Sequence, residues 1–185
     1  MRLFAAVLPP AGVVEELGGV VDRLPGGDGV RWTGRGGWHL TLAFYGEVPD
    51  GTVEELSERL ARAAGRTGAF TIGLHGGGQF GGRALWAGVR GDLAALGRLA
   101  ERARAAGRKS GIEGEHRRYR PHLTLARARD PYDFGPYLTA LGTFAGTPWT
   151  AGELTLVRSD LPRSGVPGEQ PRYEKVGGWP LAAAR

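Results

Sequence analysis

The tetrapeptide His-Leu-Thr-Leu occurs twice in this 185-residue chain, at residues 39–42 and again at residues 122–125. Two of the four histidines therefore lie in one repeated sequence context. At average amino-acid frequencies, the same three residues would follow a given second histidine by chance roughly once in a thousand cases. The repeat therefore predicts a duplicated element, with one copy in each half of the fold.

Both copies are predicted to be β-strands, within residues 38–45 and 121–126. Side chains of a strand alternate between its two faces, so the imidazole and the hydroxyl of each copy share one face. The leucines point the other way and can pack into a core beneath helices. If the two halves face each other across a groove, that groove contains two imidazoles and two hydroxyls in a pseudo-symmetric arrangement.

Such a groove suits phosphoryl transfer. Hydrolysis of a phosphodiester without a metal needs a base that takes a proton from water and an acid that protonates the departing oxygen. Histidine titrates near pH 6.5, so close to neutrality one ring of a pair can be neutral while the other is protonated. The hydroxyls of Thr41 and Thr124 would donate to the non-bridging oxygens.

Composition narrows the possible chemistry and the class of partner. The chain has no cysteine, which excludes disulfides, thiolate zinc sites and cysteine nucleophiles. It contains no apolar run long enough for a signal peptide or a membrane span, so we expect a cytoplasmic protein without a membrane partner. The net charge is +5, and all the basic residues but Lys109 and Lys175 are arginines. Arginine binds phosphate with two donors at once, which makes RNA a plausible partner.

The hydrophobic pattern predicts strands alternating with helices. The strands are expected at residues 2–8, 38–45, 70–75, 84–89, 121–126, 151–157 and 172–177, and the helices at residues 11–24, 49–64, 92–106 and 132–141. A glycine-rich turn is expected at residues 76–82. The order strand, helix, motif strand, helix, strand recurs in broken form. This pattern favours an ancient duplication.

Aromatic residues near the motifs offer further candidates. By strict alternation Tyr45 lies on the face of His39 and Thr41, where it could stack against a base. Trp32 and Tyr119 are similar candidates, but core or rim packing is the simpler expectation for each.

The other two histidines lack the motif context, and His75 and His116 are interpreted as loop residues. A metal site formed by the motif histidines, one of these residues and a carboxylate such as Glu47 or Asp50 stays open, although no known ligand spacing supports it.

The segments His39–Glu47 and Arg120–Arg127 resemble the paired His-x-Thr-x motifs of the two-histidine (2H) phosphoesterases. They are most similar to the RNA 2',3'-cyclic phosphodiesterases once called 2'-5' RNA ligases. The start of the chain at Arg2-Leu-Phe and its end, from Ser159 through Tyr173 to Trp179-Pro-Leu181, also resemble that family. The resemblance therefore covers nearly the whole chain.

The resemblance implies an α+β, bilobal, pseudo-twofold fold in a single domain over residues 1–185, with two antiparallel β-sheets around a central cleft and helices on the outside. It implies neither a metal nor a cofactor. His39 would be the proton donor to the 3' oxygen, and His122 the proton acceptor that activates water. Thr41 and Thr124 would bind the phosphate.

Arg127 falls where the family has a phosphate-contacting arginine. Strict alternation from His122 puts Arg127 on the opposite face of the strand. A twist or a β-bulge at the end of the strand would reconcile the two expectations.

The activity implied is hydrolysis of RNA 2',3'-cyclic phosphate ends, including those of tRNA fragments, to 2'-phosphomonoesters by a monomeric enzyme. Reversible 2'-5' joining of RNA uses the same chemistry with a hydroxyl in place of water. Small cyclic nucleotides are alternative substrates. A hypothesis from another class is a module that binds RNA ends without turnover.

Overall fold

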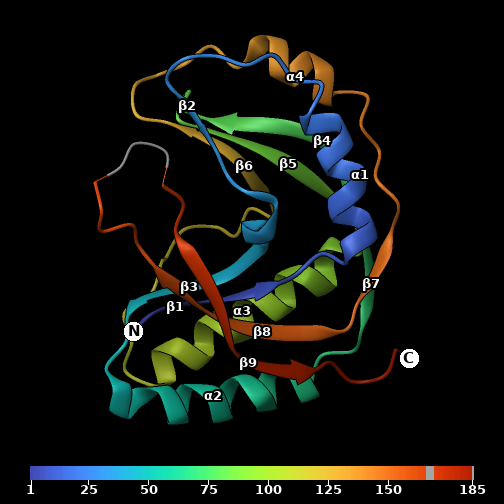
Figure 1. The fold of residues 1–185 in the computed structure, drawn as a ribbon. Helices are drawn as coiled ribbons and strands as arrows, with labels where there is room; N and C mark the ends of the chain where they lie inside the picture. The colour runs from blue at the N-terminus through green and yellow to red at the C-terminus, as the bar shows by residue number, and fades with distance from the viewer. Residues whose placement is uncertain (166–168, 185) are drawn as a thin grey trace.

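The computed structural model in Figure 1 describes residues 1–165 and 169–184. Over these residues the strands are β1 (Arg2–Val7), β2 (Val30–Trp32), β3 (Leu40–Glu47), β4 (Phe70–Phe80), β5 (Ala84–Gly91), β6 (Leu123–Ala128), β7 (Trp149–Ala151), β8 (Glu153–Asp160) and β9 (Arg172–Pro180). The helices are α1 (Ala11–Val21), α2 (Asp50–Gly65), α3 (Leu93–Lys109) and α4 (Gly135–Leu141), with a short 3-10 turn at Arg35–Gly37.

All paired strands are antiparallel, in the order β7-β4-β5-β6-β3-β1-β8-β9, and β2 adds to β6 beside this path. The two motif strands, β3 and β6, lie next to each other at the centre. From each of them three strands extend outward, β1-β8-β9 on one side and β5-β4-β7 on the other. The duplicated α+β fold predicted from the sequence is therefore confirmed.

The two motif strands pair at one residue pair, Leu40 with Leu123. Because these leucines are equivalent positions of the two motifs, a pseudo-twofold axis passes between them. The two expected sheets thus meet at this pair and form one curled sheet. An antiparallel register centred on the pair brings His39 beside Thr124 and His122 beside Thr41.

The helices cover the outside of the two lobes (Figure 1). α2 packs on α3 and against β8 and β9, and α3 packs against β3. α4 lies on β4 in the other lobe. Asp92 caps the start of α3: its carboxylate accepts a hydrogen bond from the backbone N–H of Ala95 at 3.0 Å, a standard N-cap.

The core forms beneath the motif strands, as the alternation predicted. The four motif leucines are all buried, with at most 1% of the surface exposed: Leu40, Leu42, Leu123 and Leu125. They belong to one cluster with the buried face of α3, which includes Leu96, Leu99 and Ala103. Burial of each leucine contributes about 1.5–3 kcal/mol. The same residues that stabilise the fold therefore orient the histidines toward the opposite face.

The glycine-rich segment differs from the prediction. β4 continues through Gly76, Gly77 and Gly78 to Phe80, and the turn is made by Gly81 and Gly82, both with positive φ. A Cβ on Gly77 would lie 2.7 Å from the side chain of Leu141, so this glycine makes room for α4. His75 consequently lies on strand β4 and not in a loop, whereas His116 is in a loop as expected.

Two short strands, β2 and β7, were not predicted from the sequence. Each has three residues and is defined by the neighbour it pairs with, β6 and β4 respectively. Among the described residues, no helix is long and apolar enough to cross a membrane.

We predict that Leu123→Ala lowers the free energy of unfolding by about 2–5 kcal/mol, because it leaves a cavity at the residue that joins the two halves. Urea denaturation followed by circular dichroism measures the change. The control is Leu8→Ala, at a leucine that is 43% exposed, where a change within about 0.5 kcal/mol is expected. Equal effects of the two substitutions would contradict the central role of the Leu40–Leu123 pair.

Candidate active site

The two motif histidines are anchored in the same way. Nδ1 of His39 lies 2.6 Å from the carbonyl oxygen of Gly37, and Nδ1 of His122 lies 2.6 Å from the carbonyl oxygen of Arg120. A carbonyl can only accept, so each Nδ1 carries a proton and donates it. This bond fixes the ring orientation and leaves Nε2 as the nitrogen that can exchange a proton with a substrate.

Aromatic rings hold the imidazoles in place. The ring of His39 stacks on Phe4 with centroids 4.5 Å apart, and Tyr173 meets it edge-on at 5.6 Å. His122 has an edge-to-face contact with Phe80 at 5.0 Å. These contacts exclude water from one side of each ring. They also restrict the rotation of the imidazoles, which is what an acid–base pair requires.

Each motif strand contains a β-bulge after its threonine. In the β1–β3 pairing Ala6 is opposite Thr41, but Ala5 is opposite Ala43, so β3 has one extra residue. In the β5–β6 pairing Trp86 is opposite Thr124, but Leu85 is opposite Ala126. A bulge of this kind exchanges the two faces of the strand beyond it. The duplication has therefore retained the irregularity as well as the motif.

The bulge in β6 brings Arg127 onto the face of His122. Arg127 is exposed and lines the same cavity as His122 and Thr41, whereas Ala126 and Ala128 are buried. The conflict between strict alternation and the family resemblance is thus resolved by the strand geometry. Its guanidinium charge also lowers the pKa of both His39 and His122.

The bulge in β3 overturns the prediction for Tyr45. This side chain is only 6% exposed, and its hydroxyl donates to the carbonyl oxygen of Ala103 in α3 at 2.8 Å. Its ring packs against Gly107. Tyr45 is therefore part of the core between β3 and α3, and it cannot stack against a base.

Phe44, and not Tyr45 as strict alternation predicted, faces the cleft. It is 38% exposed, lines the cavity, and lies beneath the guanidinium of Arg2 at 4.6 Å. Phe44 and Arg127 both follow their motif histidine by five residues. Aligning the two copies could have revealed this pair, but alternation alone could not.

The other aromatic candidates lie at the rim. The hydroxyl of Tyr119 donates to the carbonyl oxygen of Thr41 at 3.0 Å, which ties the loop before β6 to the first motif. Trp32 is half-buried and packs on Tyr137 with ring centroids 5.9 Å apart.

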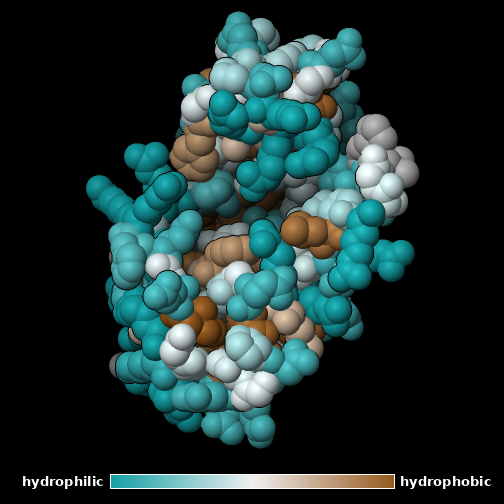
Figure 2. All heavy atoms as spheres, turned by 90° about the vertical axis from the view of Figure 1, so that its left-hand side faces the viewer, coloured by the Kyte–Doolittle hydropathy of each residue, from teal (hydrophilic) through white to brown (hydrophobic). Residues whose placement is uncertain are grey.

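The cleft between the two lobes has a volume of about 660 Å³. Figure 2 shows a hollow that crosses this side of the molecule between its upper and lower parts. Its lining combines Thr41, Phe44, Phe80, His122 and Arg127 with Glu115 and four further arginines, Arg104, Arg117, Arg118 and Arg120. A cleft with this lining is suited to an anion attached to an aromatic base.

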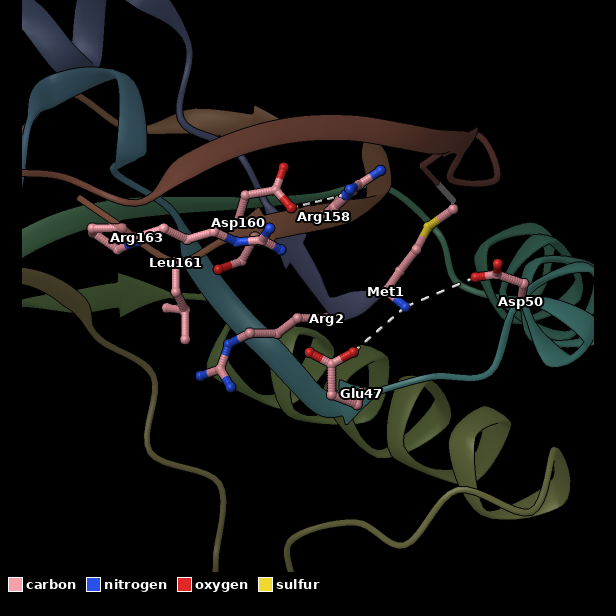
Figure 3. Close-up of a pocket in the computed structure, with 10 residues that line it drawn as sticks. Met1, Arg2, Glu47, Asp50, Arg158, Asp160, Leu161 and Arg163 are labelled. Atoms are coloured by element: carbon pink, nitrogen blue, oxygen red, sulfur yellow. Dashed lines mark hydrogen bonds and ion pairs between the residues drawn. The ribbon is translucent and has the colours of Figure 1, made fainter. Parts of the chain in front are cut away.

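A second cavity, of about 500 Å³, lies near the N-terminus (Figure 3). There the amino group of Met1 lies 3.5 Å from the carboxylate of Glu47 and 3.9 Å from that of Asp50. These are the carboxylates that a metal site would have needed, and they face Met1. Among residues 1–165 and 169–184 no group of three or more His, Asp or Glu side chains could hold a metal ion.

Burial is the largest influence on both motif histidines. Burial, against the opposing bond to Gly37 and together with the charges of Arg127 and His122, lowers the pKa of His39 to about 4. Burial and Arg127 also lower the pKa of His122, against the bond to Arg120 and the charge of Glu115. Both rings are therefore neutral at pH 7 in the free protein.

The sequence matches the family described as the 2'-5' RNA ligase superfamily over residues 17–163. It is 31% identical over 158 residues to the RNA 2',3'-cyclic phosphodiesterase of Geobacillus stearothermophilus. That alignment covers 83% of this chain and 48% of the relative, so the chain spans about half the length of this protein.

Solved structures are similar over the whole fold. Escherichia coli LigT complexed with 3'-AMP has a TM-score of 0.79 and 29% identity, with 97% of each chain covered. The protein TT0787 of Thermus thermophilus has a TM-score of 0.79 and 28% identity, with 99% of each chain covered.

We predict that Tyr45→Phe lowers the free energy of unfolding by about 1 kcal/mol, because it removes the hydrogen bond to Ala103. It should leave the KM for any nucleotide substrate unchanged. Phe44→Ala, in contrast, should raise KM, because it removes the aromatic ring that faces the cleft. Denaturant unfolding and steady-state kinetics on both variants test this. A raised KM in Tyr45→Phe would contradict the conclusion that the bulge in β3 turns Tyr45 into the core and Phe44 into the cleft.

Proposed function

This chain belongs to the 2'-5' RNA ligase superfamily, and from that premise we propose that it hydrolyses 2',3'-cyclic phosphate ends of RNA to 2'-phosphomonoesters. One observation carries the proposal. Two imidazoles with the same backbone anchor lie on one face of the sheet, together with a guanidinium whose charge acts on both. The name of the Geobacillus relative, an RNA 2',3'-cyclic phosphodiesterase, supports this substrate class.

In the proposed mechanism, His122 takes a proton from water at Nε2 as the water oxygen bonds to phosphorus. The bond from phosphorus to the 3' oxygen breaks, and His39 gives its Nε2 proton to that oxygen. The products are a 2'-phosphomonoester and a free 3' hydroxyl. These roles follow the resemblance of the two motifs to those of the family.

The lowered pKa of His39 adds a condition to this assignment. In the free protein His39 has a pKa of about 4, so the proposed donor begins without its second proton. A bound phosphodiester anion favours the charged form of a neighbouring imidazole and offsets the charge of Arg127. Substrate binding and protonation of His39 are therefore coupled in this proposal.

The remaining groups would bind the phosphate. Thr41 and Thr124 are half-buried on the face of the histidines and would each donate a hydroxyl hydrogen bond to a non-bridging oxygen. Arg127 would form a charge-assisted contact that strengthens as negative charge develops on these oxygens.

We propose further that residues 1–185 act as one monomeric domain in the cytoplasm, without a metal or cofactor, and that tRNA fragments are among its substrates. Two related activities use the same site. Reversible 2'-5' joining of RNA follows when a hydroxyl replaces water, and small cyclic nucleotides fit the same acid–base pair. That Escherichia coli LigT was crystallised with 3'-AMP supports a nucleotide-sized ligand in a cleft of this shape.

The decisive experiment incubates the protein, in the presence of EDTA, with a short RNA that ends in a 2',3'-cyclic phosphate. We expect a 2'-phosphate product. His39→Ala and His122→Ala should each lower the rate by about 10²- to 10⁴-fold. His75→Ala, at an exposed histidine on β4, is the matched control and should retain full activity. RNA binding without turnover would favour the non-catalytic binding module.

The pH dependence follows from the lowered pKa values. In the active form one of the two Nε2 atoms carries a proton, and both imidazole pKa values lie below the usual 6.5. We therefore expect kcat/KM to peak below pH 6.5 and to fall roughly tenfold per pH unit above it, as this Nε2 proton is lost. A maximum above pH 7.5 would contradict this.

The effect of Arg127 on both rings gives a further prediction. Arg127→Gln removes a positive charge that lowers both histidine pKa values, so the falling limb of kcat/KM should move to higher pH while its maximum decreases. Arg62→Gln, on the exposed face of α2, is the control and should leave the profile unchanged. A lower maximum without a shift would mean that Arg127 only binds substrate.

A further inference from the structure

A third cavity adjoins the cleft along β2 and the end of β6, with a volume of about 760 Å³. Its lining consists of Gly29, Val30, Arg31, Trp32, Arg83, Arg127, Ala128, Arg129 and Gln170. Arg127 lines both this cavity and the catalytic cleft, so the two are neighbours that share this residue. Every charged residue of this lining is an arginine. We call the four of them the arginine groove: Arg31, Arg83, Arg127 and Arg129.

The strand pairing forces the positive charges together. Arg31 in β2 lies directly opposite Arg127 in β6. Like charges directly opposite each other on antiparallel strands are destabilising. At the far end Arg83 donates to the carbonyl oxygen of Arg129 at 2.7 Å, so its side chain is held at the groove. An anion between these side chains would remove the repulsion.

Within residues 1–165 and 169–184, no ion pair involves an arginine of the groove. In the cavity near the N-terminus, by contrast, charged groups are paired with one another (Figure 3). There Arg158 contacts Asp160 at 3.1 Å, and the amino group of Met1 faces two carboxylates. The charge of the groove is thus available to a ligand, whereas that of the N-terminal cavity is largely neutralised internally.

The other side of the catalytic cleft is less suited to a second anion. There Arg104 donates to the carbonyl oxygen of Arg117 at 2.7 Å and lies over Tyr119. Arg120 lies over Phe80 at 5.8 Å, and Glu115 adds a negative charge to this wall. Arg104 and Arg120 thus support the loop before β6 and the wall beside it, and Glu115 opposes one of the four positive charges there.

We propose that the arginine groove binds the phosphodiester backbone of the RNA chain that precedes the cyclic end. This inference rests on the proposed function, and it assigns an oligonucleotide as the preferred substrate. The terminal cyclic phosphate lies at Arg127, and the upstream phosphates follow Arg31, Arg83 and Arg129. Trp32 lines the same groove and offers an aromatic surface to an unpaired base.

The test compares kcat/KM for a 2',3'-cyclic mononucleotide with that for oligonucleotides of increasing length that end in the same nucleotide. We expect kcat/KM to rise with length by about tenfold or more, because each charge-assisted phosphate contact contributes about that factor. Arg31→Gln and Arg129→Gln should each remove most of this gain. Each should also make the slope of log kcat/KM against log salt shallower by about 0.7.

Two further variants serve as controls. Arg62→Gln lies on α2, outside the groove, and should leave the length dependence intact. Arg118→Gln removes a charge from the other side of the cleft. If Arg118→Gln and not Arg31→Gln abolished the gain, the chain would leave the cleft on that side and the inference would be wrong.

The outcomes separate this inference from the proposed function. Equal kcat/KM for all lengths would show that the arginine groove does not bind the upstream RNA chain, and the proposed activity would be unaffected. No turnover of any substrate, the mononucleotide included, would overturn the proposed function itself. Thermal melts verify folding: Arg31→Gln should melt no lower than the unchanged protein, because it relieves a cross-strand repulsion.

Discussion

The pairing of Leu40 with Leu123 is the constraint on which the rest of the structure depends. It joins the two halves at equivalent residues, so the sheet has its pseudo-twofold axis where the two motifs meet. Because both leucines are buried, their neighbours on each strand must face the other way. This one pairing therefore sets the register between the two motif strands and places two imidazoles and two hydroxyls on the same face.

The bulges convert this symmetric scaffold into an asymmetric site. Each exchanges the faces of its strand after the threonine, and each brings the fifth residue after the histidine into the cleft. In one copy that residue is Phe44 and in the other it is Arg127. One wall of the cleft thus has an apolar ring and the other a positive charge. A duplicated geometry with divergent side chains gives a base-sized surface on one side and an anion contact on the other.

The features that could be predicted from the sequence are those that depend on local residue pattern. The repeat, the buried leucines, the helices and the shared face of the two histidines all follow from periodicity and composition. The burial of Tyr45 could not be predicted in this way. A bulge is a property of two paired strands, and the alternation of one strand does not reveal it. The glycines at 76–78 looked like a turn because their role is to accommodate Leu141 and Trp86, which lie elsewhere in the chain. The three-residue strands β2 and β7 exist only through their partners.

Charge pairing distinguishes structural from functional arginines in this chain. Arg59 and Arg108 each contact a carboxylate on their own helix, an arrangement that adds a few tenths of a kcal/mol and needs no ligand. Arg31 and Arg127 instead lie opposite each other on the adjacent strands β2 and β6. There the repulsion between two like charges lowers the stability of the fold. A glutamine at either position would avoid this repulsion, and an anion bound between the two guanidinium groups, as proposed above, would offset it.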